Sequence, residues 1–330
     1  MTAQLQSARG LTRGSSVLDS AADAIGHTPL VRLNRITQGL DGQILAKLDY
    51  LNPGSSKKDR IARQILEDAI ATGDLAPGQE VIEQTSGNTG TGAAIVCATQ
   101  GRRFTAVMSR GNSEERALMM RALGAEVLLV DQAVGSAPGQ VSGEDIALAE
   151  AAADALTIER GAFRIDQFER AGSVRAHELH TGPEIWHASG GAVTAFCDFI
   201  GSGGTFAGLH RAFKARDPRI KSYVVEPANA AVMAGRAPSG GHRIQGGGYS
   251  RDSLTLMRGI EPDGHLQVTD AEATAAARRL ACEEGIFAGF SSGANLAAAL
   301  QLLKGPERGG VIAIVICDSG LKYLSTDLWD

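Results

Sequence analysis

A lysine at the start of a predicted helix is the residue whose type and position most suggest chemistry. Residues 52–60 read NPGSSKKDR and lie between a predicted strand and a predicted helix. The positive end of the helix dipole disfavours an ammonium group there, which lowers the pKa of a lysine and favours the nucleophilic neutral amine. A pair of solvated surface lysines is the alternative, and this short motif alone does not exclude it.

Three further polar, glycine-bearing turns precede predicted helices. Residues 84–90, QTSGNTG, offer backbone N–H groups and small polar side chains that suit a carboxylate. Residues 201–205, GSGGT, follow a strand, and their glycines let the backbone approach a phosphate. Residues 289–294, GFSSGA, form the last of these turns. For each one, an ordinary turn with a polar helix cap is the alternative.

The elements that position these turns are short apolar runs alternating with helical runs. Strands are predicted at 44–48, 80–85, 104–108, 127–131, 194–200, 223–226 and 311–316. Helices are predicted at 58–72, 89–100, 113–123, 142–159, 206–216, 270–284 and 292–303. This alternation predicts an α/β fold with parallel-rich sheets covered by helices on both faces. In such folds, ligands bind at the carboxyl ends of the strands, and the turns above lie at those ends.

Composition excludes several other classes of function. The 330 residues carry a net charge of −5 with no long basic run, so no nucleic-acid partner is expected. The four cysteines are far apart in apolar stretches, which predicts buried thiols in a reducing compartment and no metal site. The first 20 residues lack the apolar core of a signal peptide, and no apolar run spans a membrane. A cytoplasmic protein that does not bind membranes is therefore expected.

Taken together and in this order, the four motifs resemble the cysteine synthase and cystathionine β-synthase family of fold-type II pyridoxal-phosphate (PLP) enzymes. The similarity runs from residues 26–30, GHTPL, to residues 318–325, DSGLKYLS. It implies a two-lobed fold like that of the tryptophan synthase β-subunit, and a homodimer. Residues 45–160 are expected to form a smaller mobile lobe that carries the carboxylate loop. Residues 161–330, joined by about 15–44, are expected to form the PLP-binding lobe, with residues 1–14 disordered.

The resemblance also implies roles for individual residues. The family segment Asn-Pro-x-x-Ser-x-Lys-Asp-Arg places the Schiff-base lysine at Lys58, not Lys57, and Lys58 would also remove the substrate α-proton. Cofactor contacts are implied for Asn88 at the 3′-oxygen, for Gly201, Ser202, Gly203, Gly204 and Thr205 at the phosphate, and for Ser291 at the pyridine nitrogen. Substrate contacts are implied for Thr85, Ser86, Gly87, Thr89 and Gln167 at the α-carboxylate, and for Gly247 and Tyr249 near the entrance.

The implied reaction is β-replacement on serine or an O-activated serine through an α-aminoacrylate. A neutral hydroxyl at Ser291 makes the ring a weaker electron sink, which favours prompt loss of the β-substituent. Sulfide giving cysteine is the default second substrate, and homocysteine or an amine is the alternative. The Tyr249-bearing loop resembles cystathionine β-synthases rather than typical cysteine synthases, and Lys57 stands where relatives usually carry a small apolar residue.

Two other classes of function are weighed against this one. A serine or threonine dehydratase is less consistent with the TSGNT loop and with Gln167, because dehydratases of this fold usually differ at those positions. A non-catalytic binding protein is opposed by the joint presence of Lys58, Asn88 and Ser291 with the 201–205 loop.

Overall fold

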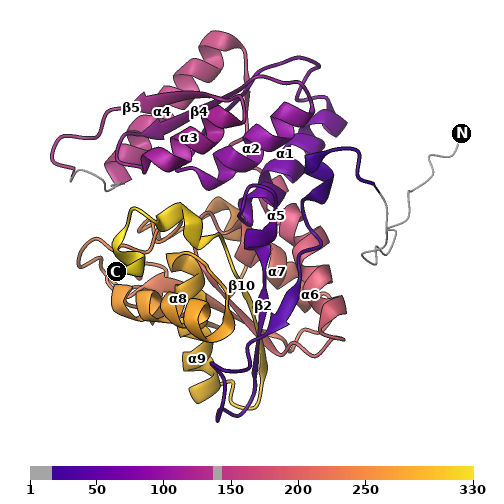
Figure 1. Cartoon of the computed structure of the whole chain (residues 1–330), viewed down its shortest axis with the longest axis vertical. Helices are drawn as coiled ribbons and strands as arrows, with labels where there is room; N and C mark the ends of the chain where they lie inside the picture. Colours follow the sequence, from indigo (N-terminus) through magenta and orange to yellow (C-terminus); the bar gives the residue numbers. More distant parts are fainter. Residues whose placement is uncertain (1–16, 137–142) are drawn as a thin grey trace, which may run out of the picture.

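Two sheets, each covered by helices, organise the residues 17–136 and 143–330 that this computed structural model describes. Within those residues, one sheet has six strands in the order β1-β2-β10-β7-β8-β9, and the other has four in the order β5-β4-β3-β6. All neighbouring strands are parallel except β1 and β2. In Figure 1, the smaller sheet with α1–α4 forms the upper lobe and the larger sheet forms the lower lobe. The two-lobed α/β fold is therefore confirmed.

The strands are β1 (Leu30–Arg32), β2 (Gln43–Lys47), β3 (Val81–Gln84), β4 (Phe104–Ser109), β5 (Glu126–Val130), β6 (Phe163–Arg164), β7 (Ala195–Phe199), β8 (Lys221–Pro227), β9 (Gly264–Val268) and β10 (Val311–Val315). The main helices are α1 (Lys58–Thr72), α2 (Asn88–Thr99), α3 (Glu114–Ala122), α4 (Gly143–Arg160), α5 (Gly172–Ala176), α6 (Gly182–Ala188), α7 (Gly204–Lys214), α8 (Asp270–Glu284) and α9 (Phe290–Lys304). A π-helical segment, His177–Thr181, joins α5 to α6.

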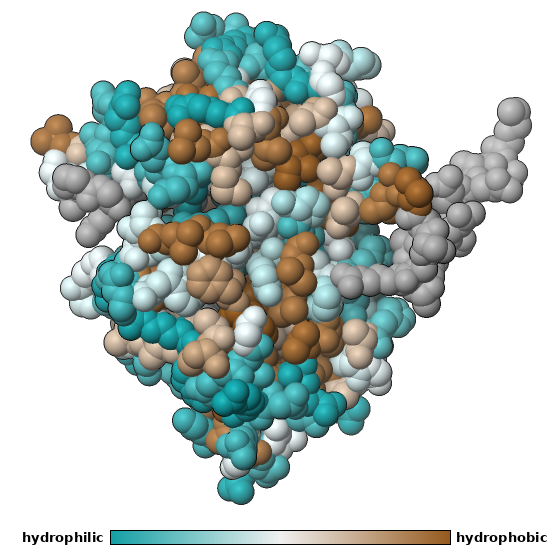
Figure 2. Space-filling view, viewed as in Figure 1, coloured by the Kyte–Doolittle hydropathy of each residue, from teal (hydrophilic) through white to brown (hydrophobic). Residues whose placement is uncertain are grey.

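Each sheet buries alternate residues on opposite faces, as expected for strands whose side chains alternate. In the larger sheet, Cys197 and Phe199 of β7 pack towards α8 and α9, whereas Phe196 packs towards α7. In the smaller sheet, Val81 faces α1 and α2, while the adjacent Ile82 faces α4. Figure 2 shows the outer face as a mixture of polar and apolar patches, with a mainly hydrophilic lower end. The apolar cores therefore lie between the sheets and their helices.

Sheet membership differs slightly from the expected lobe limits. Strand β2 crosses the expected limit at residue 45 and belongs wholly to the larger sheet. Strand β6 lies beyond residue 160, yet it pairs with β3 in the smaller sheet. The predicted disorder of residues 1–14 lies outside the described residues. Among the described residues, no helix combines the length and the apolar composition that a membrane span requires.

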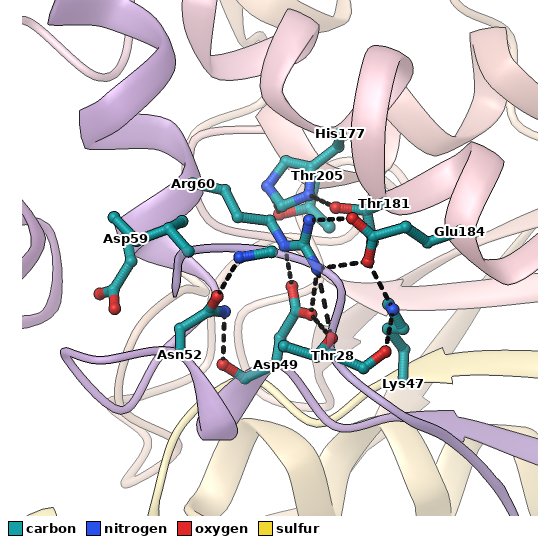
Figure 3. Close-up of polar contacts among 12 residues, drawn as sticks. Thr28, Lys47, Asp49, Asn52, Asp59, Arg60, His177, Thr181, Glu184 and Thr205 are labelled. Atoms are coloured by element: carbon teal, nitrogen blue, oxygen red, sulfur yellow. Dashed lines mark hydrogen bonds and ion pairs between the residues drawn. The ribbon is translucent and has the colours of Figure 1, made fainter. Parts of the chain in front are cut away.

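A buried network of charges fixes the first turn of α1 to the larger lobe (Figure 3). Arg60 donates to both carboxylate oxygens of Asp49 at 2.9 Å and to those of Glu184 at 2.7 and 2.8 Å. Lys47 forms an ion pair with Glu184 at 2.6 Å. Burial acts to raise the pKa of Glu184, but Arg60 and Lys47 outweigh it and hold that pKa below its ordinary value. The two cations and two anions thus neutralise one another inside the protein.

We predict that Asp49→Asn destabilises the protein strongly. Removal of one carboxylate leaves the buried guanidinium of Arg60 incompletely neutralised, which costs about 3–5 kcal/mol in comparable buried pairs. Urea unfolding followed by circular dichroism measures the change. Glu67→Gln is the matched control, because it breaks a partly exposed ion pair with Arg63 on the same helix and costs about 0.5 kcal/mol or less. Equal losses in the two variants would contradict this role of the network.

Candidate active site

Loops from both sheets converge on one small cavity of about 40 Å³. It lies beyond the carboxyl ends of β3, β6 and β10, where ligands bind in parallel α/β folds. The residues that line it are Lys57, Lys58, Ser86, Asn88, Thr89, Gln167, Gly246, Tyr249, Ser291 and Cys317. The cavity therefore brings together predicted residues from distant parts of the sequence, together with Lys57, Gly246 and Cys317, for which no site role was predicted.

Lys58 is the first residue of α1, and its side chain reaches this cavity. Burial, assisted by the positive charge of Lys57, lowers the pKa of Lys58 to about 8. Among the described residues, no carboxylate forms an ion pair with its amine. At pH 7, about a tenth of Lys58 is therefore an uncharged amine with nucleophilic and basic character, far more than an ordinary lysine provides.

Lys57 is not a solvated surface lysine. Its side chain is buried, and its Nζ lies 2.8 Å from Oδ1 of Asp198 on β7. Burial acts to lower the pKa of Lys57, but the carboxylate of Asp198 outweighs it and holds that pKa above the ordinary value. The alternative interpretation of the lysine pair as solvated surface is therefore wrong, and the pKa values of the two lysines are shifted in opposite directions.

The orientation of the Asn88 amide is fixed by two charged neighbours. Lys322 donates to its Oδ1 at 2.7 Å, and its Nδ2 donates to Asp318 at 2.8 Å. Since an ammonium only donates and a carboxylate only accepts, the amide cannot be flipped without losing both bonds. Tyr323 holds Asp318 in turn, donating to it at 2.6 Å. One amide hydrogen of Asn88 remains for a ligand in the cavity.

Only part of the predicted carboxylate loop reaches the cavity. Ser86 and Thr89 line it, and Thr89 donates to Gln167 at 2.6 Å, which joins the loop to the segment after β6. The hydroxyl of Thr85 instead accepts from the backbone N–H groups of Gly87 and Gly90, both at 3.0 Å. Thr85 therefore caps the start of α2, and neither Thr85 nor Gly87 is among the cavity-lining residues.

Gly87 has a structural role beside this loop. Its φ of +128° lies in the region that favours glycine, and a Cβ there would overlap the side chain of Arg116. The buried Arg116 donates to the carbonyl of Ser86 and to Oε1 of Gln245, each at 2.8 Å. Sequence reasoning did not single out Arg116, although it links the loop of the smaller lobe to a loop of the larger lobe.

The loop 201–205 joins β7 to α7 and presents the N-terminus of that helix. Gly203 takes the left-handed conformation at the helix cap, and Ser202 and Thr205 are buried. The hydroxyl of Thr205 lies 3.2 Å from Nε2 of His177, whose pKa burial lowers well below its usual value. Unpaired N–H groups and the helix dipole make such a terminus a binding site for phosphate.

The entrance loop lies directly on the end of β7. Gly248 donates to the carbonyl of Ile200 at 2.8 Å, and a Cβ on Gly247 would overlap the same carbonyl oxygen. Gly247 therefore serves close backbone packing, while the neighbouring Gly246 lines the cavity. Tyr249 also lines the cavity, and its ring packs edge-on against Phe168 with centroids 5.9 Å apart.

Ser291 lies in the first turn of α9 and faces the cavity, and the helix cap is Gly289 rather than a serine. The thiol of Cys317 donates to the carbonyl of Val315 and accepts from Nδ2 of Asn295, both at 3.5 Å, and burial raises the pKa of that thiol. Cys97 and Cys197 are buried as expected, but Cys282 is exposed, so the prediction of four buried thiols is wrong for that residue. Position 282 lies near the end of the surface helix α8, where an apolar sequence context does not imply burial.

These residues fit PLP by their donor chemistry. The cavity holds an amine of lowered pKa, one free amide hydrogen on Asn88 and a neutral hydroxyl on Ser291. A helix N-terminus suited to phosphate borders it, because Gly201 packs against the carbonyl of Gly246. Among the described residues, no cluster of three or more His, Cys, Asp or Glu side chains is arranged to hold a metal ion.

Comparisons with known proteins agree with this chemistry. Residues 21–318 match the family model described as pyridoxal-phosphate dependent enzyme. Cysteine synthase 3 of Caenorhabditis elegans is 39% identical over 97% of this chain and 92% of its own length. Among solved structures, O-ureido-L-serine synthase superimposes with a TM-score of 0.85 at 35% identity, covering 96% of each chain. The O-acetylserine dependent cystathionine beta-synthase from Helicobacter pylori gives 0.87 at 31% identity, covering 96% of this chain and all of its own.

The fold, the cavity and the similarity over nearly the full length lead to one conclusion. The chain belongs to the cysteine synthase and cystathionine β-synthase family of fold-type II, PLP-dependent enzymes.

Proposed function

We propose that this enzyme replaces the β-substituent of an O-activated serine with a nucleophile, with Lys58 as the lysine that binds PLP and moves the α-proton. The observation that carries the proposal is the partly neutral amine of Lys58 in a cavity shared with Asn88, Ser291 and the Thr89–Gln167 pair. Cysteine synthases and an O-ureido-L-serine synthase among the relatives support this reaction class.

PLP, when bound, supplies an electrophilic aldehyde for the amino group and a conjugated ring that accepts electrons from the α-carbon. Lys58 holds the proton released at the α-carbon, because its pKa near 8 allows both protonation states near neutral pH. Ser291 would hold the ring nitrogen through a neutral hydrogen bond, and Asn88 would offer its remaining amide hydrogen to the ring oxygen. The N–H groups of residues 201–205, at the start of α7, would hold the phosphate.

The substrate carboxylate is proposed to bind at Ser86, Thr89 and Gln167. Hydrogen bonds to an anion are stronger than those between neutral groups, so the carboxylate would order this loop. The smaller lobe, predicted at about residues 45–160 and containing β3 to β6 in the structure, would then close towards the larger lobe and exclude water. Thr85 and Gly87 would shape the loop rather than contact the carboxylate. Thr85 accepts a hydrogen bond from the N–H of Gly90, and Gly87 packs against Arg116.

The leaving group and the nucleophile are open to more than one assignment within this class. Sulfide, which gives cysteine, remains the default nucleophile, as in the cysteine synthases. Tyr249 at the cavity favours a larger nucleophile such as homocysteine or an amine, because its hydroxyl can orient a polar group. The cystathionine β-synthase from Helicobacter pylori supports this alternative. A homodimer in the cytoplasm is the setting we propose for either reaction.

A prediction for the reaction concerns Lys58 itself. The PLP-loaded enzyme should release acetate from O-acetylserine and, with a nucleophile present, yield a β-substituted alanine detected by mass spectrometry. Lys58→Ala should reduce acetate release by about two to four orders of magnitude, since it removes the proposed general base. Lys304→Ala, at the exposed end of α9, should behave as wild type. Full activity of Lys58→Ala, or pyruvate as the sole product whatever the nucleophile, would contradict the proposal, and the second result would indicate a dehydratase.

A second prediction for the reaction concerns Tyr249. If its hydroxyl orients the nucleophile, Tyr249→Phe should leave acetate release unchanged and slow capture of homocysteine or an amine about fivefold, the usual worth of one hydrogen bond. Capture of sulfide should change little. Tyr249→Ala tests packing, because it also removes the ring contact with Phe168. A defect confined to acetate release, or sulfide as the best nucleophile of all, would favour a plain cysteine synthase.

A further inference from the structure

The ion pair between Lys57 and Asp198 has no role in the reaction as proposed above. The two side chains lie 141 positions apart in the sequence, and their residues are only 6% and 2% exposed. The same oxygen of Asp198 also accepts from Nδ2 of Asn295 on α9 at 3.5 Å, and Asn295 in turn accepts from the N–H of Phe199 at 2.6 Å. The pair is therefore built into the junction between α1, β7 and α9.

Stability is a poor explanation for this pair. The attraction between two buried charges is about as large as the free energy needed to remove both from water. Apolar residues of similar volume can therefore often replace such a pair without loss of stability. The position of Lys57 adds to the cost, because an ammonium at the N-terminus of α1 faces the positive end of the helix dipole. The positive charge of Lys57 thus lies at a position that is unfavourable for stability.

The surroundings of Lys58 show what this charge can act on. Lys57 and Lys58 are consecutive and line the same cavity. The charged and titratable groups that face Lys58 are Lys57 on its own helix, Asp198 on β7, Cys317 and Asp318 after β10, and His177 of the π-helical segment. After burial, Lys57 is the largest influence that lowers the pKa of Lys58, whereas Cys317, Asp198 and Asp318 oppose it.

We propose that Lys57, anchored by Asp198, is a positioning residue for the reaction: it supplies a fixed positive charge that increases the fraction of the neighbouring Lys58 in its neutral, nucleophilic form. The charge stays fixed because Asp198 accepts from Lys57 at 2.8 Å and Asn295 restrains Asp198. The backbone N–H of Lys57 donates to the carbonyl of Cys317 at 2.8 Å, and both residues line the cavity together with Ser291, the residue proposed to face the ring nitrogen. This role rests on the proposed function of Lys58 as the PLP-binding lysine.

The test measures the protonation of Lys58 directly, without relying on turnover. The full-length protein, freed of PLP, is labelled with an amine-reactive reagent over a range of pH, and mass spectrometry follows the peptide that contains Lys58. In Lys57→Met, the midpoint of Lys58 labelling should rise by about one pH unit or more, because a like charge is lost while Asp198 remains. The rate of PLP binding near neutral pH should fall about tenfold in parallel, since one pH unit is a tenfold change in neutral amine.

Three further variants separate charge from packing. Lys57→Arg keeps the charge and should keep the wild-type midpoint. Lys57→Met combined with Asp198→Asn removes both charges without leaving a buried anion, so it should fold even if the single variant does not, and its midpoint should rise by less. Arg63→Met removes a cation from the partly exposed side of the same helix and should leave the midpoint unchanged.

The outcome that overturns the inference is an unchanged Lys58 midpoint in both Lys57→Met and the double variant, with only thermal stability reduced. Such a result assigns the pair a structural role. This outcome is distinct from failure of the proposed function, in which PLP would not attach to Lys58 in the wild type. The labelling curves of wild type and variants can still be compared in that case.

Discussion

The buried guanidinium of Arg60 is the interaction on which the geometry of the cavity depends. Helix α1 packs its apolar side into the core of the smaller lobe through Ile61 and Ile65. Its first turn, in contrast, is bound through Arg60 to Asp49 and Glu184. Asp49 precedes α1 in the sequence and Glu184 follows it, and both belong to the larger lobe. Lys58 lies at the start of this helix and is therefore positioned by both lobes at once. Displacing this first turn relative to Asp49 and Glu184 would separate a buried charge from its partners, at high cost.

Parallel topology explains why the other residues meet Lys58. Ser86 and Gln167 follow the ends of β3 and β6 in the smaller sheet, and Cys317 follows the end of β10 in the larger sheet. All three residues line the cavity. Because each sheet is parallel apart from the edge strand β1, each gathers its loops at one edge, and the two edges face the same cavity. The smaller lobe would bind mainly the substrate and the larger lobe mainly the cofactor. The reaction therefore requires the two lobes to be correctly positioned relative to each other.

Local sequence pattern predicted the longer helices and most of the strands, and the family resemblance predicted most of the residues that line the cavity, but neither predicted the partners of the charges there. Helices 58–72 and 270–284 were predicted at their observed limits. Strand β6 has only two residues and gives no periodic signal, so it was missed. Lys57 was open to interpretation as a surface lysine because its ion-pair partner Asp198 is 141 positions away in the sequence. The hydrogen bond from Lys322 to Asn88 joins residues 234 positions apart, and local pattern does not predict such a contact. Thr85 is as small and polar as its neighbours, so the sequence does not show which hydroxyl faces the cavity. The structure shows that the hydroxyl of Thr85 caps α2 instead.

The central claim is that Lys58, and not the adjacent Lys57, is the reactive lysine. The most direct measurement is borohydride reduction of the PLP-loaded protein, followed by peptide mapping of the lysine that retains the cofactor. Burial and a cationic neighbour leave Lys58 partly neutral, whereas Asp198 holds Lys57 protonated, so the account predicts the label on Lys58 alone. A label on Lys57 would contradict it, because the ion pair would then be the reactive group and the assignment of every cavity residue relative to it would have to change.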